Sequence, residues 1–225
     1  MTGGHRQRAA PFLVACAVLV SGCGTEDTTA PSNPSDLATV KALTPDQAAA
    51  IEKVYVEALR LEAKGGVAKR RTRAASDAAI APVLRACGAL DGNDALMREL
   101  FRSCAGEGTF LRFTAGTYRC TNPDLCSEAY MAQRAALGRL VAAERRADRA
   151  VRATALAPAC KQVLTTPASS YAGFRELDGL LVKIINALES QSRRDRTRAA
   201  RAARAFEAPV QSTQGRLDLF RSSCR

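Results

Sequence analysis

The sequence predicts an all-α fold: a disulfide-stapled bundle of five or six helices with one short non-helical insert. Three observations lead to this class. Apolar residues recur at helical spacing through most of the chain, proline and glycine lie where helices should begin and end, and six cysteines after residue 80 can form three cross-links. Residues 41–225 are enough for a single helical domain with its own core.

The first predicted helix has a clear start and end. Thr44 is an N-cap residue, Pro45 occupies the first helical position and Gln47 completes a capping box. Apolar residues then follow at helical spacing, and Gly65-Gly66 ends the helix.

Two shorter helices are predicted next. One runs from the Thr72 region through Cys87, and the other runs from Asn93 to Cys104. The basic run at 69–73 precedes them and contains no aromatic residue, so we interpret it as a solvated connector. Binding to an anionic surface is the alternative.

Residues 105–122 break the helical pattern and form the predicted insert. Two stretches rich in threonine and aromatic residues, 109–114 and 117–120, flank Ala115-Gly116, which is typical of a small β-hairpin. Phe110, Phe113 and Tyr118 would anchor this insert to the bundle. A recognition surface is the alternative.

A long helix is predicted to begin at Asn122-Pro123 and to carry two acids on its apolar stripe. Glu144 and Asp148 lie in register with Leu137, Val141 and Val151. Paired carboxylates can act as general acid and base. We favour ordinary ion pairing, because four arginines surround the two acids: Arg145, Arg146, Arg149 and Arg152.

The rest of the chain predicts further helices. Pro158 interrupts the pattern, and Thr166-Pro167 begins a helix that continues toward Phe206, either unbroken or broken near residues 190–192. A last helix carries Leu217, Leu219 and Phe220. We interpret one basic face as solvated, with anionic lipid or polymer as the alternative partner: Arg194, Arg198, Arg201 and Arg204.

The N-terminal residues have the order of an export signal. Residues 1–8 are basic and carry no acid, and residues 9–20 carry no charge. Twelve such residues form about 18 Å of helix, whereas a spanning segment must cross about 30 Å. We therefore expect a cleaved signal and not a permanent transmembrane helix.

The signal ends in Val20-Ser21-Gly22-Cys23, which resembles the lipobox of bacterial lipoproteins. The resemblance implies removal of residues 1–22, a diacylglycerol group on Cys23 and a membrane anchor formed by two or three acyl chains. An ordinary secretory signal, or modification at Cys16, is the alternative. Residues 24–39 have almost no large apolar side chain, so 23–40 is predicted to be a tether spanning about 20 Å.

The remaining cysteines are predicted to form structural disulfides, as in other exported chains. They are Cys87, Cys104, Cys120, Cys126, Cys160 and Cys224. Fifteen pairings are possible, and only Cys120 with Cys126 is favoured, because these two are close in sequence across a proline. No Cys-x-x-Cys spacing supports the alternative of a metal cluster.

The composition excludes several classes of function. The single histidine, His5, lies in the signal, so the mature chain has no histidine for a nucleophile triad, a zinc site or haem. We predict no catalytic residue, metal or cofactor. Removing Arg6 and Arg8 leaves 31 basic and 22 acidic residues, a net charge of +9.

These features together predict a lipid-anchored binding or interaction protein of the bacterial cell envelope, facing outside the cytoplasm. It is not expected to be an enzyme. The expected partners are the membrane through the anchor, and an anionic envelope polymer, lipid or envelope protein; nucleic acid is not expected. The alternatives are a wall-polymer enzyme that uses the paired carboxylates and a purely structural envelope component.

Overall fold

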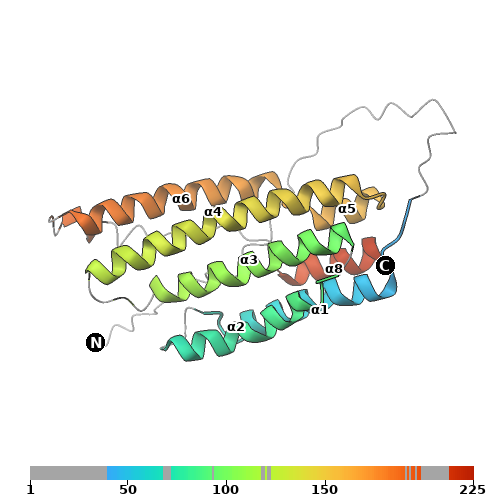
Figure 1. The fold of residues 1–225 in the computed structure, drawn as a ribbon, viewed down its shortest axis with the longest axis horizontal. Coiled ribbons are helices and arrows are strands. Elements are labelled where there is room, and N and C mark those ends of the chain that lie inside the picture. Colours follow the sequence, from blue (N-terminus) through green and yellow to red (C-terminus); the bar gives the residue numbers. More distant parts are fainter. Residues whose placement is uncertain are drawn as a thin grey trace, which may run out of the picture.

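The computed structural model describes residues 40–67, 72–92, 94–117, 120, 123–190, 192, 194–195, 197–198 and 213–225. These residues form an all-α bundle and contain no strand, which confirms the predicted fold class (Figure 1). The predicted signal, Cys23, the tether and most of the basic run lie outside the described residues. So do Tyr118, Arg201, Arg204 and the segment toward Phe206.

The described helices are α1 (Pro45–Ala63), α2 (Arg73–Gly88), α3 (Ala95–Thr117), α4 (Pro123–Ala153), α5 (Pro158–Leu164), α6 (Ala168–Glu189) and α8 (Thr213–Cys224). Their starts follow local signals in the sequence. Thr44 and Gln47 form the predicted capping box on α1, and the Thr72 hydroxyl caps α2. Gly65 and Gly66, with φ of 80° and 60°, reverse the chain after α1.

The predicted non-helical insert is wrong for residues 105–117. Helix α3 does not end at Cys104 but continues to Thr117, so the first stretch of the expected hairpin is helical. Phe110 and Leu111 are buried in this added helix. Burial of these apolar side chains against the neighbouring helices stabilises the helix more than the β propensity of the local residues opposes it.

The later helices agree with the sequence patterns except at one position. Helix α6 ends at Glu189, with Ser190 extended, so of the two alternatives the helix is broken near residues 190–192. In α8, Leu217 and Phe220 are buried but Leu219 is 46% exposed. A residue two positions from Leu217 lies on the other side of a helix, which explains its exposure.

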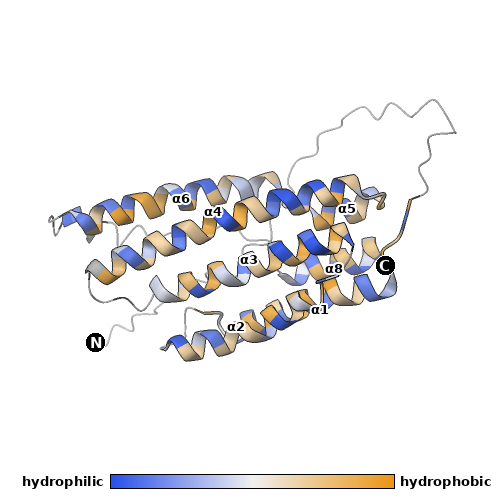
Figure 2. Ribbon diagram, viewed as in Figure 1, coloured by the Kyte–Doolittle hydropathy of each residue, from blue (hydrophilic) through white to orange (hydrophobic). Residues whose placement is uncertain are grey.

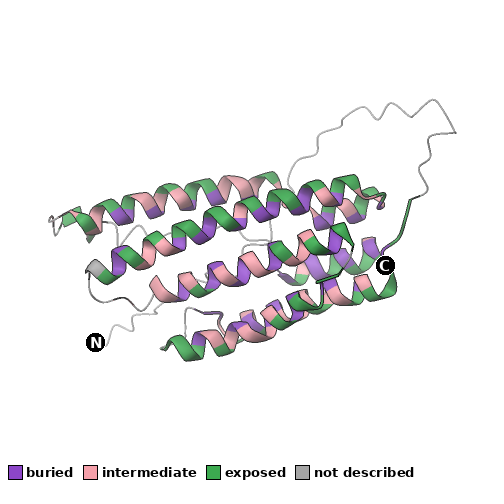
Figure 3. Cartoon of the chain, in the orientation of Figure 1, coloured by how far each residue is buried: buried purple, intermediate pink, exposed green. Residues whose placement is uncertain are grey.

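The helices form two apolar clusters joined through α3 and α4. The smaller cluster lies between the C-terminal half of α3, α4 and α6, and centres on Phe110, Leu140 and Phe174. The larger cluster lies between α1, α2, α3, α5 and α8 and includes Val151 of α4. Figure 3 shows buried and exposed positions alternating along the long helices, as amphipathic packing requires.

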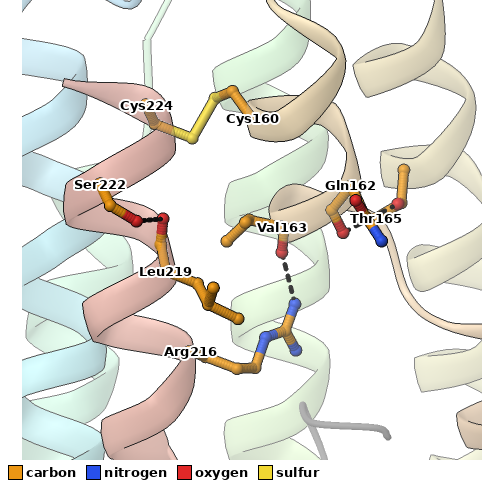
Figure 4. Close-up of a disulfide and its surroundings, with 8 residues drawn as sticks. All are labelled: Cys160, Gln162, Val163, Thr165, Arg216, Leu219, Ser222 and Cys224. Atoms are coloured by element: carbon orange, nitrogen blue, oxygen red, sulfur yellow. Dashed lines mark hydrogen bonds between the residues drawn. A yellow bond between two sulfur atoms is a disulfide. The ribbon is translucent and has the colours of Figure 1, made fainter. Parts of the chain in front are cut away.

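Three disulfides cross-link the bundle: Cys87–Cys104, Cys120–Cys126 and Cys160–Cys224. The predicted Cys120–Cys126 pair is confirmed. The other two join helices, α2 to α3 and α5 to α8, and the second of them is drawn in Figure 4. The six cysteines therefore serve as structural links, as the sequence predicts.

Candidate functional site

A cavity of about 100 Å³ lies inside the larger half of the bundle. Side chains from α1, α3, α4 and α8, from the turn after α2 and from the segment around α5 line it. Its lining combines a mainly aliphatic part with carboxylate, hydroxyl, phenol and guanidinium groups. The residues are Ile51, Val54, Tyr55, Ala58, Leu90, Leu100, Ser103, Cys104, Glu107, Glu144, Ala147, Leu164, Thr166, Thr213 and Arg216.

Two carboxylates and one guanidinium line this cavity, and all three are buried. Glu107, Glu144 and Arg216 are 8%, 5% and 8% exposed. Burying charged groups is costly unless hydrogen bonds and opposite charges compensate, so such groups are uncommon in a helical core. Their presence around one hollow indicates a polar site built inside an apolar bundle.

Two hydroxyls hold the Glu144 carboxylate in place. Ser103 Oγ on α3 donates to Glu144 Oε1 at 2.6 Å, and Thr166 Oγ1 donates to Oε2 at 2.5 Å. These two bonds, one to each carboxylate oxygen, fix the orientation of Glu144 at the wall of the cavity.

Asp148, one turn further along α4, has a different role. It accepts from the Thr166 backbone N–H at 2.7 Å and from the Tyr171 hydroxyl at 2.8 Å, and it is not among the residues that line the cavity. These bonds fix the start of α6 against α4. Burial, followed by the bond to Asp148, raises the pKa of the Tyr171 hydroxyl, so it stays a donor.

The predicted ion pairing of Asp148 with neighbouring arginines is wrong for the contacts that the structure describes. Arg145 stacks over the Tyr171 ring, with its guanidinium carbon 5.7 Å from the centroid, and Arg146 pairs with Glu99. Helix geometry explains the difference. The acids occupy the buried stripe of α4, whereas all four neighbouring arginines occupy its exposed face.

Arg216 on α8 contributes its guanidinium to the wall of the cavity. Its Nη2 donates to the Val163 carbonyl at 2.7 Å, and the group lies 6.0 Å from the Tyr55 ring centroid. Figure 4 shows the side chain reaching from α8 to α5, the helices that Cys160–Cys224 also joins. The disulfide therefore helps to fix the position of this cation.

A second carboxylate–hydroxyl contact lies next to the cavity. Thr213 Oγ1, at the start of α8, donates to Glu62 near the end of α1. Burial raises the pKa of Glu62, and the bond from Thr213 partly opposes this effect.

Sequence reasoning identified one of the three buried charged residues of the cavity. Glu144 was visible because it lies on an apolar stripe. Glu107 was missed because its segment was expected to be non-helical; on a helix it falls in register with Cys104 and Leu111. Arg216 was missed because an arginine beside Leu217 resembles any solvated residue, although its spacing of four from Phe220 carried the signal.

The described residues offer neither a metal site nor a membrane-spanning helix. Within the described ranges, no group of three or more His, Cys, Asp or Glu residues is placed to hold a metal ion. None of the described helices combines the length and apolar character that crossing a membrane requires. No protein-family model, curated protein or solved structure matches the chain.

Proposed function

We propose that this chain is a lipid-anchored protein of the bacterial cell envelope that binds a small ligand in the central cavity. The cavity is the observation that carries the binding role. The location rests on the signal, on the lipobox ending in Cys23, and on the pairing of all six later cysteines with one another. Such pairing is typical of proteins that fold in an oxidising compartment.

The size and lining of the cavity define the class of ligand. An apolar cavity of about 150 Å³ holds a benzene molecule, so about 100 Å³ fits a somewhat smaller compound. The aliphatic part favours a short hydrocarbon group. Because two carboxylates and one guanidinium line the cavity, the polar part favours a cationic group, so we propose a small organic amine.

Binding can be tested with n-butylammonium as the probe and with 1-butanol and butanoate as neutral and anionic analogues. In ligand-observed NMR on the mature protein, we expect the affinity to fall in the order butylammonium, butanol, butanoate. We expect Glu144→Gln to weaken butylammonium binding at least about tenfold, because a charged hydrogen bond is lost. Glu176→Gln, at an exposed position of α6, is the matched control and should change nothing.

Two results would count against this assignment. Equal binding of the three probes would remove the cationic ligand class, and no binding of any probe would remove the small-ligand role. Glu144→Gln alters a buried residue, so the fold of this variant must be checked. Its far-ultraviolet circular dichroism spectrum must match that of the unaltered protein. Glu107→Gln, on a different helix, gives an independent test of the same charge effect.

The anchor has its own test. Mass spectrometry of the membrane fraction should find residues 1–22 removed and acyl chains on Cys23. Cys23→Ala should move the protein out of that fraction, whereas Cys16→Ala should leave it there. A protein that stays membrane-bound without acylation at Cys23 would contradict the anchor and leave the cavity untouched.

The geometry favours binding over catalysis by the two acids of α4. An acid–base pair must present both carboxylates to one substrate, whereas Glu144 faces the cavity and Asp148 is occupied by Thr166 and Tyr171. Unchanged turnover of isolated wall polymer by a Glu144→Gln, Asp148→Asn double variant, or no turnover by the unaltered protein, would retire the enzyme alternative.

A further inference from the structure

The exposed side of the second half of α4 has an unusual composition. From residue 135 to residue 153, its exposed positions hold only arginine, alanine and glycine. The two acids of this stretch, Glu144 and Asp148, are buried instead. We call the five exposed basic residues the arginine face: Arg139, Arg145, Arg146, Arg149 and Arg152.

The arginine face carries charge that its neighbours only partly neutralise. Arg146 pairs with Glu99 at 3.3 Å. Within the described ranges, Arg139, Arg149 and Arg152 form no ion pair with a carboxylate. Thirteen residues separate the first and last arginine, about 20 Å of helix. Figure 2 shows hydrophilic residues concentrated along this part of α4, toward α5.

A backbone hydrogen bond places the entry of the chain beside this face. The Lys41 N–H donates to the carbonyl of Ala155 at 2.6 Å, two residues after the end of α4. The chain from Cys23 therefore joins the bundle at the C-terminal end of the arginine face. The predicted tether of about 20 Å is no longer than the face itself, so an anchor at Cys23 would keep the face close to the membrane.

We propose that the arginine face rests on anionic phospholipid headgroups of the membrane that holds the anchor. The orientation rests on the lipid anchor proposed above. Guanidinium groups pair with phosphate in a forked geometry, and the alanines and the glycine between them let the helix approach closely. No exposed aromatic or large aliphatic side chain interrupts this face, so the contact is electrostatic and does not involve insertion.

The tether is the reason for preferring lipid to an anionic wall polymer. Either partner offers negative charge, but the anchor brings lipid headgroups to the arginine face at high local concentration without a separate binding step. Each arginine near an anionic surface contributes a factor of about five to the affinity. The face therefore lies flat on the membrane and sets the orientation of the bundle.

Arginine footprinting tests this arrangement on the mature protein. The protein is placed in phosphatidylcholine vesicles with or without phosphatidylglycerol, treated with phenylglyoxal, and mapped by mass spectrometry. In the anionic vesicles, we expect the rate of modification of the arginine face to fall at least about fivefold. High salt should restore the rate seen without phosphatidylglycerol. Arg85 on α2 and Arg175 on α6, both exposed, should react equally in all vesicles.

Charge reversal supplies the matched variants. Arg139→Glu, Arg149→Glu and Arg152→Glu together should expose Arg145 and Arg146 to modification in anionic vesicles. The control variant, Arg85→Glu, Arg175→Glu and Lys183→Glu, changes the net charge equally at other exposed positions and should leave that protection intact. Loss of protection in both variants would mean that net charge alone acts, and would overturn the proposal.

The remaining outcomes separate this proposal from the anchor. An acylated protein whose arginine face is never protected by anionic vesicles would keep the anchor and overturn the lipid contact. Protection by isolated wall polymer alone would assign the face to polymer and also overturn it. Protection by anionic vesicles of a protein without acylation at Cys23 would keep the lipid contact and remove the anchor.

Discussion

Thr166 connects the two buried acids of α4. Its hydroxyl donates to Glu144 and its backbone N–H donates to Asp148. Thr166→Val keeps the backbone bond and removes the hydroxyl bond to Glu144, so it should lower the free energy of unfolding by about 1–3 kcal/mol. Thr165 is the adjacent residue, and its hydroxyl donates an exposed hydrogen bond to the Gln162 carbonyl. Thr165→Val should therefore lower the free energy of unfolding clearly less. Urea unfolding measures both, and equal losses would contradict the role of Thr166.

Glu62 should make stability depend on pH. Because burial raises its pKa above the ordinary value of 4.5, the folded state binds the proton more tightly than the unfolded chain. Its contribution to stability therefore falls as pH rises from 4.5 through the folded-state pKa. Glu62→Gln keeps an acceptor for Thr213. At pH 7 this variant should have a higher melting temperature than the unaltered protein, and the difference in melting temperature should disappear below pH 4.5. A constant gap would contradict this account.

Among the elements, α3 packs tightly against α2 at Gly108, which lies against Leu84. A β-carbon there would lie 2.3 Å from Leu84 Cδ2 and 3.1 Å from its Cγ. Alanine is a better helix former than glycine by about 1 kcal/mol, but overpacking costs about 1–3 kcal/mol, so Gly108→Ala should be net destabilising. Gly138→Ala on α4 has no atom within 4 Å and should stabilise. Thermal unfolding compares the two, and stabilisation by both would refute the close approach.

The sequence predicted elements well where the signal was local. The helix starts at Thr44 and Thr72 each depend on a few adjacent residues, and both were confirmed. The second half of α3 was missed, because its threonines and aromatics favour strand until contacts with other helices are known. The cavity was beyond prediction for the same reason, since its lining comes from residues 51 to 216 and depends on how helices distant in sequence pack together.

For the whole molecule, the three disulfides differ in the length of chain that they close. Cys160–Cys224 spans 64 residues and Cys120–Cys126 spans 6. A disulfide stabilises a protein by reducing the entropy of its unfolded chain, and more so for a longer loop. Replacing the first pair with alanine should therefore lower the free energy of unfolding by about 4 kcal/mol, and replacing the second pair by about 2 kcal/mol. Chemical unfolding of the two double variants measures this order, and a larger loss for the shorter loop would contradict it.

The packing of α1 against α8 has a consequence for incomplete chains. Helix α1 is synthesised first, yet Tyr55 packs on Phe220 and Glu62 receives its hydrogen bond from Thr213, both in the last described helix. A chain that stops before α8 leaves the part of α1 that packs on α8 uncovered, and leaves Cys160 without its partner. Such a fragment offers proteases an exposed apolar surface and a free thiol, so we expect it to be degraded faster than a chain that includes α8.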